Sequence, residues 1–375
     1  MYIDPSTLPF VGLEKVPPIP PRAARLYADH ANRLAGQVSR LLALHPRIDE
    51  FLNGNPFRLF EVNHRNHGAF VAEVLRTNNF DLLARALPWA YHAYHHQGVP
   101  YDYFAVQLDA WKQAIRDQLP SAEALSLLPV YDWMLSVHAD TILAAERYQS
   151  KHPVVPADLS EVYAHIVESL LAGDHLTVLD HSRALLDDGM PFSHLLQAIF
   201  YPAMVEVGVR WEQGRITVSM EHQATTMVYL VLSTLYYKQP FPAARRGRAL
   251  VASVSNEFHE LGAWMVASCL ELDGWEVTFL ASDCALETLV QTLREEAPRF
   301  VALSVSLLSN LEAARETIAA LRAALGPGSD TRILVGGRAL LTAPSLLDSL
   351  GADLFLTDCE TAVSWARTLG ESDER

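Results

Sequence analysis

The sequence predicts a multidomain protein of the α and α/β classes, with an all-helical N-terminal region, a small four-helix bundle and a C-terminal parallel sheet. Three observations predict this fold. Apolar residues recur at helical spacing up to about residue 149, two proline-containing breaks divide the chain, and strand and helix patterns alternate after the second break. With 375 residues, half of them apolar, the chain can build two or three cores. We expect domains at 1–152, 157–240 and 247–370.

The first two regions are predicted to be helical throughout. Amphipathic patterns indicate helices at 24–44, 80–96, 108–118 and 130–147. After Pro153 and Pro156, four further helices are expected at 159–172, 175–187, 191–211 and 218–237. The loops between these four are short, which is typical of antiparallel neighbours in a bundle.

The last region alternates strands and helices. Strands are expected at 249–255, 276–281, 300–306, 332–336 and 354–357, with helices at 261–272, 286–296, 311–325 and 341–350 between them. Five strands with intervening helices predict a doubly wound, five-stranded parallel sheet.

Composition limits the classes of partner. The formal charge is 29 − 44 = −15 without a basic block, which argues against a direct nucleic-acid partner. The N-terminus has no signal-peptide pattern, and no segment is long and apolar enough to span a bilayer. We therefore expect a cytoplasmic protein that does not associate with a membrane. Three scattered cysteines suggest neither a disulfide nor a zinc site. No nucleophile–base pair stands out, and we predict no enzymatic activity.

The motif Glu257-x-His259-x-x-Gly262 is the strongest candidate site. It lies between a predicted strand and a predicted helix, where open α/β sheets place ligands. A carboxylate can orient the imidazole of His259 toward a metal, and a glycine lets a bulky ligand approach the backbone. The other candidate residues are Phe258 and Leu261 within the motif, and Ser304, Ser306, Gly336 and Gly337 at the ends of the third and fourth strands.

These residues resemble the cobalamin-binding module shared by methionine synthase, corrinoid methyl carriers and CarH-type light-sensing repressors. The resemblance covers about residues 159–369 and implies a Rossmann-like domain under the lower face of the corrin. It implies His259 as the lower cobalt ligand, Glu257 as its orienting carboxylate, and Ser304 with Gly336 and Gly337 along the nucleotide tail. The methionine synthase group has aspartate at the position of Glu257, so the glutamate favours the light-sensing branch.

The bundle carries a second motif, Trp211 followed by Glu221-His222. It resembles the tryptophan and Glu-His of the light sensors, which shelter the adenosyl group of adenosylcobalamin above cobalt. The repressors have a histidine after the tryptophan that ligates cobalt once light has removed the adenosyl group. This chain has Glu212 there, and carboxylate is a poorer ligand for soft cobalt. The identity of the upper cobalt ligand after photolysis is therefore left open.

The N-terminal region is rich in histidines and aromatic residues. His92, His95, His96 and Tyr103 are the candidates for binding a second chromophore, with Arg65 or Arg76 for its carboxylates. The order of the regions resembles that of the photocobilins, which implies a globin-like domain that binds biliverdin, a linear tetrapyrrole. No cysteine precedes Cys269, which excludes a thioether anchor here. The alternative is a helical domain with aromatic residues in its core and exposed histidines.

Together the patterns predict a photoreceptor in which light cleaves the cobalt–carbon bond of adenosylcobalamin, with biliverdin as second chromophore. We expect a homo-oligomer that signals by a change of assembly or through a separate protein. Two alternatives remain: a corrinoid carrier of methyl groups between methyltransferases, and a haem or redox sensor with structural cobalamin. The bulky set of Trp211, Glu221 and His222 speaks against the carrier, since it would obstruct a partner enzyme.

Overall fold

The computed structural model describes residues 12–342 and 347–370. The chain divides into two compact units. The first comprises Met1–Ser150 with Glu212–Arg215, and the second comprises Lys151–Trp211 with Ile216–Arg375. No helix in the described ranges combines the length and the apolarity needed to cross a membrane.

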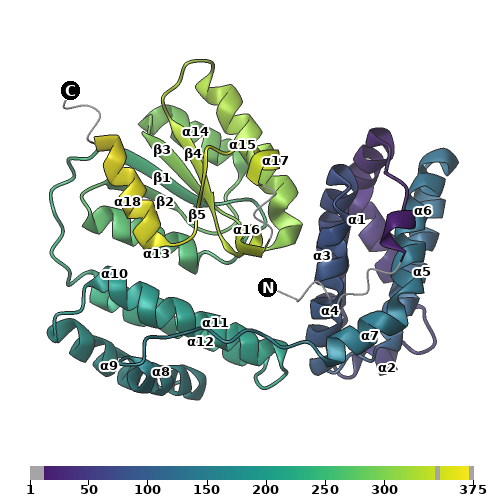
Figure 1. Cartoon of the computed structure of the whole chain (residues 1–375), viewed down its shortest axis with the longest axis horizontal. Coiled ribbons are helices and arrows are strands. Elements are labelled where there is room, and N and C mark those ends of the chain that lie inside the picture. The colour runs from purple at the N-terminus through teal and green to yellow at the C-terminus, as the bar shows by residue number, and fades with distance from the viewer. Residues whose placement is uncertain (1–11, 343–346, 371–375) are drawn as a thin grey trace. The chain divides into compact units, whose positions relative to one another are not determined.

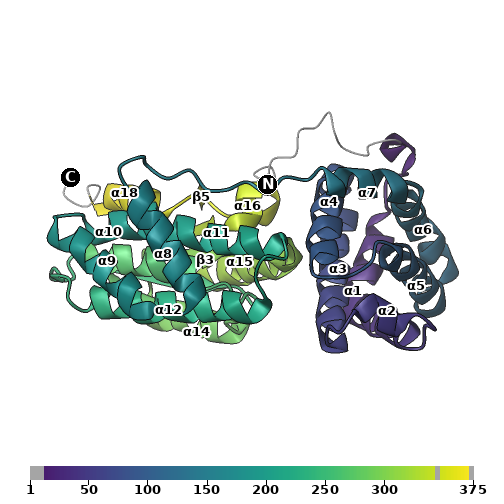
Figure 2. The same ribbon diagram turned by 90° about the horizontal axis from the view of Figure 1, so that it is seen from below.

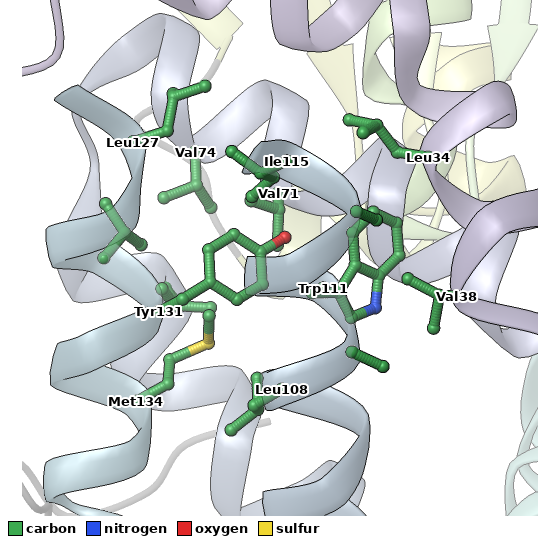
Figure 3. Packing of buried hydrophobic residues seen from close by; sticks show 14 of the residues in the cluster. Leu34, Val38, Val71, Val74, Leu108, Trp111, Ile115, Leu127, Tyr131 and Met134 are labelled. Atoms are coloured by element: carbon green, nitrogen blue, oxygen red, sulfur yellow. The ribbon is translucent and has the colours of Figure 1, made fainter. Parts of the chain in front are cut away.

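The first unit is helical (Figures 1 and 2). A short 3-10 turn, η2 (Leu13–Lys15), precedes seven helices in its described part: α1 (Pro21–Ala43), α2 (Ile48–Leu52), α3 (Phe57–Thr77), α4 (Phe80–His96), α5 (Asp102–Gln118), α6 (Ser121–Ser136) and α7 (His138–Glu146). Its core is dense, with Trp111 and Tyr131 fully buried among aliphatic side chains of α1, α3, α5 and α6 (Figure 3). The helical class of this region is confirmed.

Helix α3, like the short α2, is an element that the sequence patterns did not predict. It contains Asn63, Asn66 and Gly68, which are weak helix formers. Packing explains the helix, because a Cβ on Gly68 would lie 3.0 Å from the Trp111 ring. The glycine lets α3 approach α5 closely, and tertiary contacts override the local preference. The predicted helix 130–147 was also wrong, since the chain forms α6 and α7 with a break at Val137.

The second unit begins with the predicted bundle. Its elements are α8 (Ser160–Ala172), α9 (His175–Asp187), α10 (Phe192–Leu195), the π-helical η3 (Leu196–Phe200), α11 (Tyr201–Glu212) and α12 (Val218–Tyr236). Asp174 caps α9 by accepting a hydrogen bond from the Thr177 amide, and Thr217 caps α12 by accepting one from the Met220 amide. The apolar core of the bundle extends onto the sheet domain, which the views show beside it (Figures 1 and 2).

A five-stranded parallel sheet completes the second unit, in the order β2-β1-β3-β4-β5. The strands are β1 (Arg248–Ser253), β2 (Glu276–Leu280), β3 (Phe300–Ser304), β4 (Arg332–Gly336) and β5 (Leu354–Leu356), and the helical elements are α13 (Leu261–Leu272), α14 (Leu286–Glu296), η4 (Leu308–Asn310), α15 (Leu311–Leu325), α16 (Arg338–Thr342), α17 (Leu347–Leu350) and α18 (Cys359–Gly370). Helices α13 and α18 pack together, as do α14 and α15 (Figure 1). The Rossmann-like prediction is confirmed.

The expected helix 341–350 lies partly outside the described residues. Within them, α16 already begins at Arg338 and α17 covers Leu347–Leu350. The third strand ends at Ser304, two residues earlier than predicted. The Val305 amide still donates to the Gly336 carbonyl of β4, but the amides of Ser306 and Leu307 donate to the Glu257 side chain.

Candidate functional site

The Glu257–His259 motif lies at the switch point of the sheet. The chain leaves β1 toward β2 on one side, and β3 lies on the other side of β1. The loops after β1 and β3 meet at this point, where sheets of this topology bind ligands in a crevice outside the strand ends. The first of these loops carries the motif, and the second carries Ser306 and Leu307.

Glu257 is the fixed centre of this crevice. Its side chain is fully buried and accepts five hydrogen bonds. Oε1 accepts from the His259 amide at 3.0 Å and from His259 Nδ1 at 2.7 Å. Oε2 accepts from the amides of Ser306 (2.8 Å) and Leu307 (3.0 Å) and from Asn310 Nδ2 (3.0 Å). Burial by itself raises the pKa of this carboxyl, but the bonds from His259 and Asn310 hold the pKa below its usual value.

His259 presents one ring nitrogen to the carboxylate and keeps the other for a ligand. With the carboxylate ionised, Nδ1–H donates to Glu257, so Nε2 carries the lone pair. The side chain is 60% exposed, and no described residue bonds Nε2. The hydrogen bond to Glu257 raises the pKa of His259, and burial partly opposes that effect. The pair can therefore present a fixed, basic imidazole to a metal ion.

The start of α12 carries a carboxylate whose charge acts on this imidazole. The charge of the Glu221 carboxylate contributes to the raised pKa of His259, so the bundle brings an acidic group into electrostatic range of the motif. Glu221 is held in place, since its carboxylate contacts His222 Nδ1 at 2.5 Å and accepts a bond from Thr225 Oγ1 at 3.0 Å. His222 is largely exposed, and Trp211 is half-buried against the bundle core. Glu221 is thus near enough to His259 for their charges to interact.

Small and hydroxyl-bearing residues line the end of the sheet. Ser253 of β1 pairs in register with Ser304 of β3, which pairs with Gly336 of β4, so all three side-chain positions share one face. Ser304 is almost buried and Ser306 is half-buried. The hydroxyl of Ser253 is buried without a hydrogen-bond partner among the described residues.

The remaining motif residues differ in surroundings. Phe258 is 68% exposed, Leu261 is half-buried, and a Cβ on Gly262 would meet nothing within 4 Å. The environment of Gly337 differs from the expected close approach to a ligand. Its φ is 110°, and a Cβ there would lie 2.3 Å from the Val305 carbonyl oxygen. The backbone of the neighbouring loop therefore already requires a glycine at this position.

Three side chains at the site were missed by sequence reasoning. Asn310 of η4 donates a hydrogen bond to the Glu257 carboxylate, and Tyr229 of α12 lies near Glu260. Arg338 approaches α11, because its Nη1 would lie 3.9 Å from a Cβ on Gly208. Only Tyr229 had a signal, since it follows Glu221 by eight residues on one helical face. Tertiary folding alone brings the other two to the site.

The predicted chromophore residues lie in the first unit. His92 and His96 are one helical turn apart on α4, with ring centroids 4.2 Å apart, and the Nε2 of the buried His92 has no hydrogen-bond partner in the described chain. His95 stacks on the Tyr101 ring at 4.0 Å. Tyr103 lies away from these rings, fully buried, with its hydroxyl 2.8 Å from His64 Nε2. The structure gathers the three histidines and leaves Tyr103 in the core.

Glu212 belongs to the first unit. Its side chain is 3% exposed and accepts a hydrogen bond from Ser150 Oγ at 2.9 Å. Burial lowers the pKa of the nearby His92, and the charge of Glu212 opposes part of that effect. The turn that follows packs closely against the backbone of α4, because a Cβ on Gly214 would lie 2.3 Å from the His96 carbonyl oxygen. Glu212 is thus committed to neighbours in the first unit.

Comparison with known proteins identifies the cofactor class. Models of B12 binding domains match residues 247–364 and 162–236. The HTH-type transcriptional repressor CarH of Myxococcus xanthus is 32% identical over 178 residues, which cover 48% of this chain and 57% of that protein. Trimethylamine corrinoid protein 1 of Methanosarcina acetivorans is 23% identical over 218 residues, covering 57% of this chain and 99% of that protein.

A solved structure, the Methanosarcina barkeri monomethylamine corrinoid protein, matches with 16% identity and a TM-score of 0.49 over 56% of this chain and 99% of that chain. The chain spans little more than half the length of the repressor that it matches.

The residues present fit a cobalamin. His259 offers a free Nε2, the unpartnered Ser253 hydroxyl lies at the crevice, and the space beside Gly262 admits a bulky group. In the described ranges no three His, Cys, Asp or Glu side chains converge as metal ligands, and His259 would supply one protein ligand to cobalt. The chain is therefore a cobalamin-binding protein, related in sequence to the CarH repressor and to corrinoid proteins.

Proposed function

We propose that the protein is a photoreceptor that uses adenosylcobalamin. The observation that carries this proposal is that the Glu257-bound His259 of the sheet domain presents a free Nε2 within electrostatic range of the Glu221 carboxylate of the bundle, in one compact unit. Its supports are the match to B12 binding domains on both sides and the resemblance of the Trp211 and Glu221-His222 pattern to the light-sensing repressors. Adenosylcobalamin would supply a photolabile cobalt–carbon bond.

The residues of this chain then have separate tasks. Glu257 fixes the tautomer and direction of His259, which binds from the sheet side. On the bundle side, Trp211, Glu221 and His222 would cover the bound cobalamin and exclude water from it. Because Glu221 is held by Thr225 and His222, loss of a group that it shelters changes contacts on α12 directly. We propose that this change alters the packing of the bundle on the sheet domain.

A bilin in the first unit is the second part of the proposal. The three clustered histidines of α4 and the orphaned Nε2 of His92 support a ligand there. Hydrogen bonds from imidazole to pyrrole or carboxylate groups would hold it, as no cysteine precedes Cys269. Biliverdin added to the protein should then give a red-absorbing, photoactive complex.

A corrinoid methyl carrier is the second candidate function. The similarity to Trimethylamine corrinoid protein 1 over 99% of that protein favours it. Trp211 and the Glu221-His222 pair favour the photoreceptor, since a carrier must expose the upper face to partner enzymes. A haem or redox sensor with structural cobalamin is the third reading. We further propose a cytoplasmic, non-enzymatic homo-oligomer that acts on a separate downstream protein rather than on nucleic acid.

Spectroscopy separates these functions. The full chain is loaded with adenosylcobalamin in the dark, illuminated with green light, and followed by its visible spectrum and by size-exclusion chromatography. The photoreceptor should bind adenosylcobalamin stably, change its spectrum, and change its elution volume after light. His259→Ala should alter the dark spectrum, because the lower ligand is lost. Stable binding of methylcobalamin but not of adenosylcobalamin would support the carrier and reject the photoreceptor.

A further inference from the structure

The surface of the first unit has a hollow of about 330 Å³ between α1 and α3. Its lining includes Gly36, Ser39 and Arg40 of α1 and Phe57, Glu61 and Arg65 of α3. None of these residues belongs to the cobalamin site or to the histidine cluster of α4. The volume is at the lower end of the range for small-molecule sites, which is about 300–1,000 Å³.

The polar groups at the floor of the hollow already have hydrogen-bond partners. Ser39 Oγ donates to the Ala35 carbonyl at 2.9 Å and lies 2.8 Å from His64 Nδ1, and His64 Nε2 bonds the Tyr103 hydroxyl at 2.8 Å. Ser39 and His64 are both buried. The space beside Gly36 is open, since a Cβ there would meet nothing within 4 Å.

The rim is positively charged. Arg40 donates only to the amide oxygen of Gln37, and neither Arg40 nor Arg65 has a carboxylate within ion-pair distance in the described chain. By contrast, Arg76 on the same helix as Arg65 is paired with the buried Glu73. The hollow thus has two guanidinium groups against the single carboxylate of Glu61, in a chain whose net charge is −15. Phe57 adds an apolar wall.

We propose that this hollow binds a small molecule with a carboxylate on an apolar body. Arg65 and Arg40 bind the carboxylate, since guanidinium groups match its geometry and charge. Phe57 and the backbone at Gly36 contact the apolar part. The volume suits a short fatty acid or a small aromatic acid better than a tetrapyrrole. This site does not depend on cobalamin, but it uses Arg65, which is also a candidate for the carboxylates of a bilin.

The test is a fluorescence titration of the full chain with anilinonaphthalene sulfonate, an anionic aromatic probe, followed by displacement with laurate. The wild-type protein should bind the probe saturably and release it to laurate, but not to dodecyltrimethylammonium, which has a similar chain and the opposite charge. Arg65→Gln should weaken binding about tenfold, or about 1.4 kcal/mol. Gly36→Leu should abolish it by filling the hollow.

Arg58→Gln is the matched control, because Arg58 is exposed on the same helix outside the hollow. Circular dichroism checks the fold of each variant, and Arg65→Gln decides the question should Gly36→Leu fail to fold. Probe binding that persists unchanged in Arg65→Gln, or displacement by the cation as readily as by laurate, overturns the proposal. Biliverdin is the last competitor. Displacement by biliverdin but not by laurate would show a tetrapyrrole site and refute the smaller ligand.

Discussion

The substitution Glu257→Gln tests the centre of the cobalamin site. It keeps the size of the side chain and replaces one carboxylate oxygen by an NH₂ group. In the wild type one oxygen accepts from two donors of His259, and the other accepts from Ser306, Leu307 and Asn310. Whichever way the amide is turned, its NH₂ faces at least two donors that have lost their acceptor.

The cost follows from burial. Glu257 is 0% exposed, so water cannot replace the missing acceptor. A buried unsatisfied donor costs about 1–3 kcal/mol, so two of them should lower the free energy of unfolding of the second unit by about 2–6 kcal/mol. Loss of an orienting carboxylate typically lowers metal affinity about 10- to 100-fold. We expect cobalamin affinity to fall by that factor.

Urea unfolding without cofactor measures the stability, and equilibrium dialysis with hydroxocobalamin measures the affinity. Glu316→Gln is the control, since Glu316 is exposed on α15 away from the crevice. A Glu257→Gln protein that unfolds at the wild-type urea concentration and binds cobalamin equally well would refute the assignment of Glu257 as the orienting group.

Three further predictions concern other parts of the chain. Burial and the charge of Arg65 lower the pKa of His64 to about 4, so the unfolded state takes up a proton near pH 6.5 that the folded state resists. The first unit should lose about 3 kcal/mol of stability between about pH 6.5 and pH 4; urea unfolding at several pH values measures this loss, and an equal slope in His64→Gln would contradict it. Gly337→Ala should destabilise the second unit by at least about 2 kcal/mol, because its Cβ would overlap Val305 at positive φ, whereas Gly262→Ala should leave apo stability intact; thermal melts compare the two. Trp211→Ala should weaken dark binding of adenosylcobalamin more than of methylcobalamin in parallel dialysis, and equal losses would remove its sheltering role.

Strong periodicity made most helices and strands predictable. The four bundle helices and all five strands lie where apolar spacing placed them, apart from shifts at their ends and a π-helical segment at η3. The patterns failed where packing outweighs local preference. Helix α3 forms despite its asparagines because Gly68 packs under Trp111, and the carboxyl end of β3 turns early because two amides bind Glu257.

The cobalamin site was predictable as a motif but not as a geometry. Spacing alone put Glu257, His259 and Gly262 on one turn, since they are close in sequence. It could not place Asn310, which lies 53 residues from Glu257 and still bonds its carboxylate. Nor could it show that Glu212 is buried against Ser150, because that contact spans 62 residues.

The sequence by itself determined the fold class and a carboxylate–histidine pair at a strand end, because these depend on local spacing and apolar periodicity. Only the tertiary structure decided that Glu221 lies within electrostatic range of His259, that Gly337 accommodates a neighbouring backbone, and that a positively charged hollow opens between α1 and α3. Such features depend on contacts between residues distant in sequence. Burial then sets their energies, since a hydrogen bond or a charge removed from water has no substitute partner.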